Sequence, residues 1–110
     1  MARFVTIGYG DRDGYDRTDA KVRDEAHAHD ARLLESGTTV GIVGSPVQVR
    51  NHDGAGVAVE DGSFMSSPLP IAGFAILEAD SLEEAVKLVS QTPCAVAQGV
   101  VEVWPLQESA

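Results

Sequence analysis

The side chains best suited to chemistry in this sequence are two histidines, His27 and His29, in a predicted helix over residues 19–36. Imidazole titrates near neutral pH, so either side chain could take up and release a proton during a reaction. The apolar stripe of this helix spans about 60° of arc and consists of Val22, Ala26, His29 and Leu33. We therefore predict that His29 is a catalytic acid or base beside a cleft. The structural alternative is a partly buried histidine whose ring is hydrogen-bonded to a strand.

The same histidines do not predict a metal site. Positions i and i+2 of a helix point about 200° apart, so His27 and His29 cannot bind one ion together. His27 and Asp30 share a face at i and i+3, but two ligands are too few for a stable site. We expect neither a metal nor another cofactor.

A glycine-rich loop follows the first predicted strand, and its side chains could contact a ligand. Gly8, Gly10 and Gly14 approach the spacing of a dinucleotide-binding loop, but the third glycine comes one position late. The aspartates of this loop would also repel a pyrophosphate. We instead expect the loop to border a cleft. The side chains that could reach a ligand from it are Tyr9, Arg12, Tyr15 and Arg17, of which Tyr9 and Arg12 are our predicted substrate-binding residues.

Arg50 and Phe64 are two further candidates for substrate binding. Arg50 stands alone as a cation in a long middle segment and could hold a carboxylate or a phenolate. A surface ion pair with Asp53 or Glu60 is the alternative for this arginine. Phe64 would provide an apolar anchor in a loop. Cys94 could act as a nucleophile, but we interpret it as a small buried residue because no histidine is near it in the sequence.

The charge of the chain limits its partners. It has 8 Lys and Arg against 17 Asp and Glu, and the formal net charge is −9. A polyanion is repelled by such a chain, so we expect no nucleic-acid partner and no binding to an anionic membrane. No apolar stretch approaches the ~20 residues that span a bilayer. A single cysteine cannot form an internal disulfide, and no basic-then-apolar leader is present, so we expect a cytoplasmic protein.

Periodicity assigns the elements that must position these residues. Strands are predicted over residues 3–9, 38–43, 71–78 and 100–104, where β-branched and apolar residues dominate. The first helix is capped by Thr18 or Asp19, and Gly37 ends it. The second helix begins with the capping pair Ser81 and Glu84 and ends before Pro93. Residues 10–18 and 60–70 are predicted to be loops.

A hairpin separates the two halves of the chain. The Asp53-Gly54 dipeptide favours a tight turn between short strands over residues 47–50 and 57–59. The element order is then β-α-β, hairpin, β-α-β, which predicts a ferredoxin-like α+β sandwich with helices on one face of the sheet. The other face would be apolar and bare. We therefore expect two copies to pack sheet against sheet as a C2 homodimer.

Residues 71–106 resemble the second half of YCII-related proteins. The residues that carry this resemblance are the run GFAILEADSLEEA at 73–85, Pro93, and the run GVVEVWPL at 99–106. The stretch EDGSF at 60–64 is similar to the "DGPF" signature of one branch, with Ser63 in place of the proline. The first half is similar in layout. The resemblance covers most of the chain.

The resemblance implies a dimeric α+β barrel in which each protomer has a cleft beside its sheet. In some members it also implies a His–Asp pair and small-molecule lyase-type chemistry, with the histidine on the first helix. His29 matches by packing face, and His27 matches by distance from Gly37. The acid is expected just before the proline that follows the second helix, where this chain has Thr92.

Two functions follow for one YCII-like domain over residues 1–106 with a short tail at 107–110. The first is a lyase- or isomerase-type enzyme for a small anionic or aromatic metabolite, with a helix histidine as acid or base. The second is a non-catalytic metabolite-binding or regulatory homodimer, and whether the chain is an enzyme stays open at this point. A carboxylate within hydrogen-bond reach of His29 in a pocket would favour the enzyme. A backbone carbonyl on a buried ring would favour the binding module.

Overall fold

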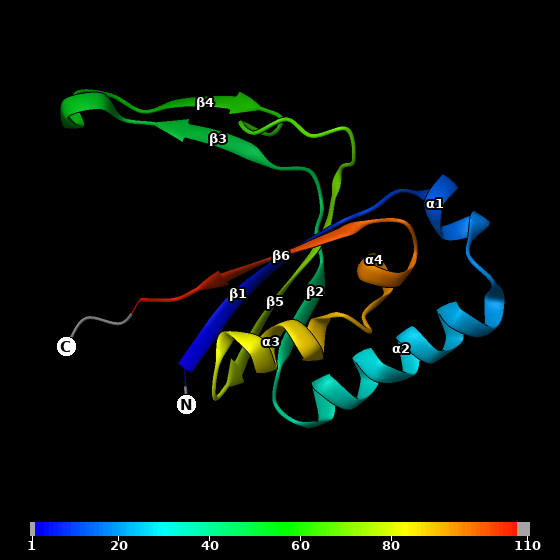
Figure 1. Ribbon diagram of the computed structural model, residues 1–110. Helices are drawn as coiled ribbons and strands as arrows, with labels where there is room; N and C mark the ends of the chain where they lie inside the picture. Colours follow the sequence, from blue (N-terminus) through cyan, green and yellow to red (C-terminus); the bar gives the residue numbers. More distant parts are fainter. Residues whose placement is uncertain (1, 108–110) are drawn as a thin grey trace.

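The computed structural model describes residues 2–107, which form an α+β fold around one antiparallel sheet (Figure 1). Its four strands are β1 (Ala2–Tyr9), β2 (Thr39–Ile42), β5 (Ile71–Ala79) and β6 (Val100–Pro105). They lie in the order β2-β5-β1-β6, so the first and third main strands of the chain fill the centre. These are the segments in which β-branched and apolar residues predicted strands. Of the predicted tail, residues 108–110 lie outside the described residues.

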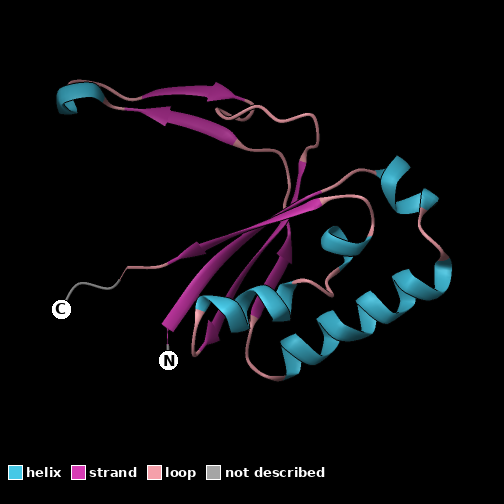
Figure 2. Ribbon diagram, viewed as in Figure 1, coloured by secondary structure: helices cyan, strands magenta, loops and turns pink. Residues whose placement is uncertain are grey.

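Helices cover one face of this sheet (Figure 2). They are α2 (Ala20–Glu35), α3 (Leu82–Val89) and the short α4 (Pro93–Val96). The packed core lies between β1, β5 and α3 and consists of Phe4, Leu77, Ala79, Ala85 and Val89. At the start of α3, the Ser81 hydroxyl accepts a hydrogen bond from the Glu84 backbone N–H at 3.1 Å, as the sequence predicted.

Two short helices stand where the sequence predicted a loop and a helix stop. Residues 10–18 contain α1 (Arg12–Arg17), because the Asp11 carboxylate accepts from the Gly14 N–H at 2.8 Å and caps a turn. Thr18 ends α1 by donating its hydroxyl to the Gly14 carbonyl, so it does not cap α2. The second predicted helix, α3, does end before Pro93, at Val89, and Pro93 itself starts α4, since the first helical position needs no N–H.

The stripe predicted for α2 is only partly buried. Ala26, His29 and Leu33 are buried, whereas Val22 is exposed near the start of the helix. The helix packs on α4 and β2, and its first turns stand clear of the sheet. A gap in the packing therefore opens beside the N-terminal half of α2.

A two-stranded hairpin, which we call the arm, projects away from the helices (Figure 1). It is formed by β3 (Val47–Arg50) and β4 (Ala58–Asp61), joined through the short 3₁₀ turn η1 (His52–Gly54). Asp53 and Gly54 have φ values of 62° and 67°, which the predicted turn requires. The arm forms its own sheet and does not pair with the main sheet. The predicted hairpin is thus confirmed, with β4 reaching to residue 61.

The sheet face away from the helices is apolar and open. Val5 lies opposite Ile76 of β5 and Trp104 of β6 in the strand register. Ile76 and Trp104 are both exposed because no helix or strand within residues 2–107 covers them, whereas the loop at 65–69 borders this side near Tyr9. We refer to this side as the open face.

Candidate functional site

A cleft of about 680 Å³ lies between the covered face of the sheet and helices α1, α2 and α4. Gly8 and Gly73 are cross-strand neighbours in its floor. A Cβ on Gly8 would lie 2.8 Å from the Cys94 Sγ, and one on Gly73 would lie 2.6 Å from the Gly41 carbonyl oxygen. The sheet can therefore approach α4 and β2 closely only because these positions lack side chains. The apolar walls of the cleft include Leu33, Val40, Ile42, Leu77 and Val89.

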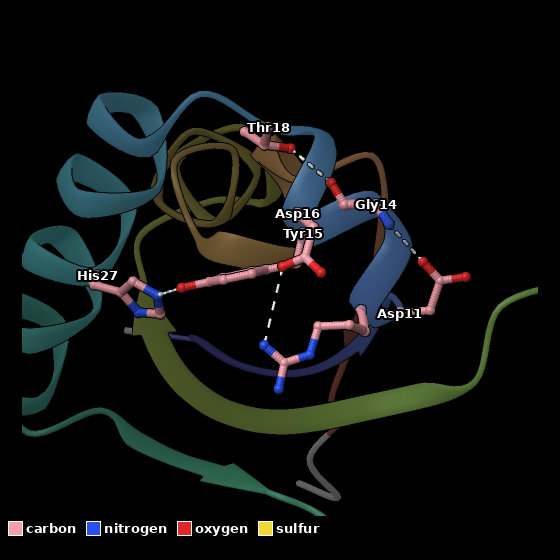
Figure 3. Close-up of polar contacts among 7 residues, drawn as sticks. Asp11, Gly14, Tyr15, Asp16, Thr18 and His27 are labelled. Atoms are coloured by element: carbon pink, nitrogen blue, oxygen red, sulfur yellow. Dashed lines mark hydrogen bonds and ion pairs between the residues drawn. The ribbon is translucent and has the colours of Figure 1, made fainter.

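Tyr15 and His27 form a hydrogen-bonded pair in the wall of this cleft (Figure 3). The Tyr15 hydroxyl lies 2.8 Å from His27 Nε2, and the two rings are tilted by 57°. The Arg23 guanidinium stacks over the tyrosine ring with its Cζ 4.7 Å from the centroid. The contact joins α1 to α2 across the mouth of the cleft. A phenol bonded to an imidazole can relay a proton in either direction, depending on the imidazole tautomer.

Asp30 lies one turn after His27 and also lines the cleft. Burial raises the pKa of the Asp30 carboxyl, and positive charge on His27 and His29 opposes this shift. Burial also raises the pKa of the Cys94 thiol, with a further contribution from the negative charge of Asp30. Cys94 is half-buried and keeps its proton, so its position does not suit a nucleophile.

His29 lies outside the residues that line the cleft. Its side chain is only 8% exposed, and Nε2 lies 2.5 Å from the Leu88 carbonyl oxygen of α3. A carbonyl only accepts, so the imidazole donates this bond and Nε2 carries the proton. This geometry is the one that we associated with a structural histidine. A catalytic role for His29 stays a prediction.

The predicted substrate-binding residues are divided between the two sides of the sheet. Arg12 lines the cleft, with its guanidinium 4.0 Å from the Asp16 carboxylate on the surface of α1. Tyr9 lies on the open face, where its hydroxyl donates to Glu102 Oε1 at 2.6 Å. That hydrogen bond, together with burial and the charge of Glu102, raises the pKa of Tyr9. Tyr9 borders a separate hollow of about 280 Å³, so it cannot share a ligand with Arg12.

Arg50 and Phe64 lie together at the arm, away from the cleft. The Arg50 Cζ is 5.8 Å from the Phe64 ring centroid. The guanidinium donates to Glu60 Oε2 at 3.3 Å and to Gln48 Oε1 at 2.8 Å. Of the alternatives that the sequence left open, the ion pair with Glu60 is the one that forms.

The sequence did not show that two polar residues from distant parts of the chain meet in the cleft. Asp30 and Thr92 both line it, although they are far apart in the chain. The shared helical face of His27 and Asp30, at i and i+3, was the available signal. It was weighed only for a metal, because nothing in the sequence shows how far α2 stands from the sheet.

Comparison with known protein families identifies one match that covers nearly the whole chain. The sequence model of the family described as the YCII-related domain matches residues 2–109. A comparison with curated proteins found no match. Among residues 2–107, no helix is both long and apolar enough to cross a membrane. The same residues contain no group of three or more metal-ligating side chains.

Proposed function

The chain belongs to the YCII-related domain family, and we propose on that premise that it binds a small organic molecule in the cleft and transfers a proton on it. The observation that supports this proposal is the Tyr15–His27 hydrogen bond in the wall of a largely apolar cleft. Cavities of roughly 300–1,000 Å³ suit small molecules, and the cleft is within that range.

The proton transfer uses the two rings in sequence. In the enol-to-keto direction, Tyr15 donates its phenolic proton to the carbon that gains hydrogen, and His27 returns a proton to the phenolate through their hydrogen bond. The proton of the enol hydroxyl leaves to water, which reprotonates His27, and the keto-to-enol direction runs through the same steps in reverse. Arg12 at the rim attracts a negatively charged group such as a carboxylate. The reaction class is an isomerisation or elimination next to a carbonyl, because such steps need one group that removes a proton and another that supplies it. Roles for Tyr9, Arg50 and Phe64 in binding this molecule remain predictions.

A non-catalytic metabolite-binding module is the second candidate. Thr92 occupies the position where the resemblance implies the acid of a His–Asp pair, and His29 is bound to a backbone carbonyl. A cleft without these groups could hold a ligand without converting it.

The assembly that we propose is a ferredoxin-like, DGPF-like homodimer located in the cytoplasm, formed by one domain over residues 1–106. The strand order β2-β5-β1-β6 supports the ferredoxin-like arrangement. The exposed Ile76 and Trp104 on the open face support packing of two sheets against each other. The net charge of −9 supports the exclusion of nucleic acid and membrane surfaces as partners.

Tautomerisation of phenylpyruvate, an aromatic 2-oxo acid, tests the proposed function. The wild-type chain should accelerate interconversion of enol and keto forms, followed by ultraviolet absorbance. His27→Gln should lower the rate about 100-fold, since positioned acid–base groups contribute factors of that order. His52→Gln is the matched control, because His52 is an exposed histidine on the arm. Equal rates for His27→Gln and wild type would overturn the proton-transfer role. Calorimetric binding of phenylpyruvate without turnover, weakened by Arg12→Ala, would establish the second candidate.

A further inference from the structure

The two faces of the arm are chemically different. Val47, Val49 and Val59 lie on one face, and their exposed fractions are 57%, 64% and 62%. Asp61, which pairs with Val47, ends this face as its charged residue. The other face has Arg50 bonded to Glu60 and Gln48, so these polar groups are satisfied within the arm. The three valines remain exposed to water in the part of the chain that the structure describes.

Such an arm is not expected to hold its shape alone. An isolated two-stranded hairpin is marginally stable in water, and a third strand or a packed body normally supports it. In the structure, β3 pairs only with β4. We therefore expect a body outside the described residues to cover the valine face when the arm is ordered.

The surface area of the chain indicates how large that body is. The accessible surface is 7669 Å², about 1,800 Å² more than the roughly 5,800 Å² of an ordinary folded monomer of this mass. The radius of gyration is 15.9 Å, against about 13 Å for a compact domain of this length. An obligate homodimer buries roughly 1,000–2,500 Å² per chain, which matches the excess.

The root of the arm is continuous with the open face. The loop Met65–Leu69 that follows the arm borders the same hollow as Tyr9, Val100 and Glu102 of the open face. One body that covers the open face can thus also meet the arm. A second copy fits this requirement, because a two-fold pair brings each chain's arm and open face to its partner at once.

We propose that the arm clasps a second copy of this chain through Val47, Val49 and Val59. This inference rests on the homodimer of the proposed function, and it assigns to the arm a share of the dimer contact. Each protomer extends its arm along the other, and the valine faces become buried on association. The polar face, with the Arg50–Glu60 ion pair, stays in water.

Two neighbouring substitutions test the proposal by sedimentation equilibrium. Val59→Asp places a charge on the valine face, and Ala58→Asp places the same charge one residue earlier on the polar face, opposite Arg50. Val59→Asp should raise the dimer dissociation constant at least about tenfold, and Ala58→Asp less than about threefold. Val59→Thr, which keeps the side-chain shape, is measured if Val59→Asp does not fold, and it should weaken the dimer in the same direction.

The possible outcomes distinguish a dimer contact made by the arm from a dimer contact made by the open face alone. Equal dissociation constants for Val59→Asp, Ala58→Asp and wild type would overturn the role of the arm and leave a dimer through the open face alone. A wild-type chain that stays monomeric at high concentration, or that dimerises only with another protein, would overturn the proposal as well. Phenylpyruvate binding and tautomerisation are measured on the same samples. Their loss in His27→Gln but not in Val59→Asp shows that failure of the cleft and failure of the clasp are distinct.

Discussion

The two faces of the main sheet carry similar aliphatic residues, but those on one face are buried and those on the other are exposed to water. On the covered face, Leu77 is 1% exposed in the core, whereas its neighbour Ile76 on the open face is 46% exposed. Two successive residues of β5 therefore lie in different surroundings, Leu77 in the protein interior and Ile76 at the water-exposed surface. This difference in exposure indicates which kind of binding each face of the sheet can support. The covered face forms a cleft with the helices of the same chain, whereas the open face of a single chain stays in contact with water.

The residues of β1 and β5 sharpen this contrast near the arm. Gly8 and Gly73 meet across the strands on the covered face and leave the cleft hollow. Their neighbours Ile7 and Phe74 meet on the open face and project outward. The covered side therefore has room for a small molecule at this point, whereas apolar side chains project from the open side.

The largest effect should come from comparing Leu77→Ala with Ile76→Ala. Leu77 belongs to the buried core, so its truncation should lower the free energy of unfolding by about 2–5 kcal/mol. Ile76→Ala should change the unfolding of the isolated chain by less than about 1 kcal/mol and should weaken the dimer instead. Urea denaturation at low protein concentration measures the first effect, and sedimentation measures the second. Equal costs for the two substitutions in the monomer would contradict the contrast between the faces.

The second comparison separates the two histidines of α2. His29→Gln removes a buried hydrogen bond to Leu88 and should lower the free energy of unfolding by about 1–3 kcal/mol. Phenylpyruvate turnover by the folded fraction should change little. His27→Gln should do the reverse, with turnover about 100-fold lower and stability almost unchanged. A larger loss of turnover in His29→Gln than in His27→Gln would return the catalytic role to the residue that the sequence favoured.

The main fold could be predicted from the sequence because its signals are local and strong. The apolar runs of β1 and β5 and the cap at Ser81 each define an element by themselves. The helix α1 was missed because Asp and Gly in its six residues are typical of loops, and one Asp11 cap outweighs that composition. At Pro93, a proline fits both the end of one helix and the first position of the next.

The candidate site was less accessible to sequence analysis because it depends on distances between elements. The stripe of α2 correctly predicted that His29 is buried, and burial against α3 places it outside the cleft. The pairing of Tyr15 with His27 requires α1 to lie across the mouth of the cleft. The hydrophobic periodicity of the sequence does not reveal such an arrangement of helices. Arg12 and Tyr9 are close in the sequence, but Tyr9 belongs to β1 and Arg12 to α1. Their side chains therefore lie on opposite sides of the main sheet.

The third prediction compares Gly73, on the covered face, with Gly41, which pairs with Phe74 and therefore belongs to the open face. Gly73→Ala should lower the free energy of unfolding by about 1–3 kcal/mol, because its Cβ would lie 2.6 Å from the backbone oxygen of Gly41 and force β2 away from β5. Gly41→Ala has no heavy atom within 4 Å of the new Cβ and should be tolerated. Thermal unfolding of both variants measures the difference. A destabilised Gly41→Ala with an unaffected Gly73→Ala would show that β2 and β5 approach differently.

The smallest effect concerns Asp30, a half-buried carboxyl that lines the cleft. Its pKa is raised by burial, so the folded state binds the proton more tightly than the unfolded chain does. The stability of the wild type should therefore fall as the pH rises from about 4, the pKa of an unfolded aspartate, through the higher pKa of the folded state. Asp30→Asn lacks this titration. Its stability relative to wild type should increase over the same interval and then level off.

Urea denaturation of the two proteins from acidic to neutral pH measures this difference. Double substitution with His27→Gln sharpens the test, because the positive charge of His27 opposes the effect of burial on the Asp30 carboxyl. Without that imidazole the pKa of Asp30 should rise further, and the pH interval in which Asp30→Asn gains relative stability should extend upward. An interval that does not move would mean that His27 and Asp30 do not share the electrostatic environment of one cleft. The proton-handling groups would then be isolated side chains, and the cleft would be reduced to a binding surface.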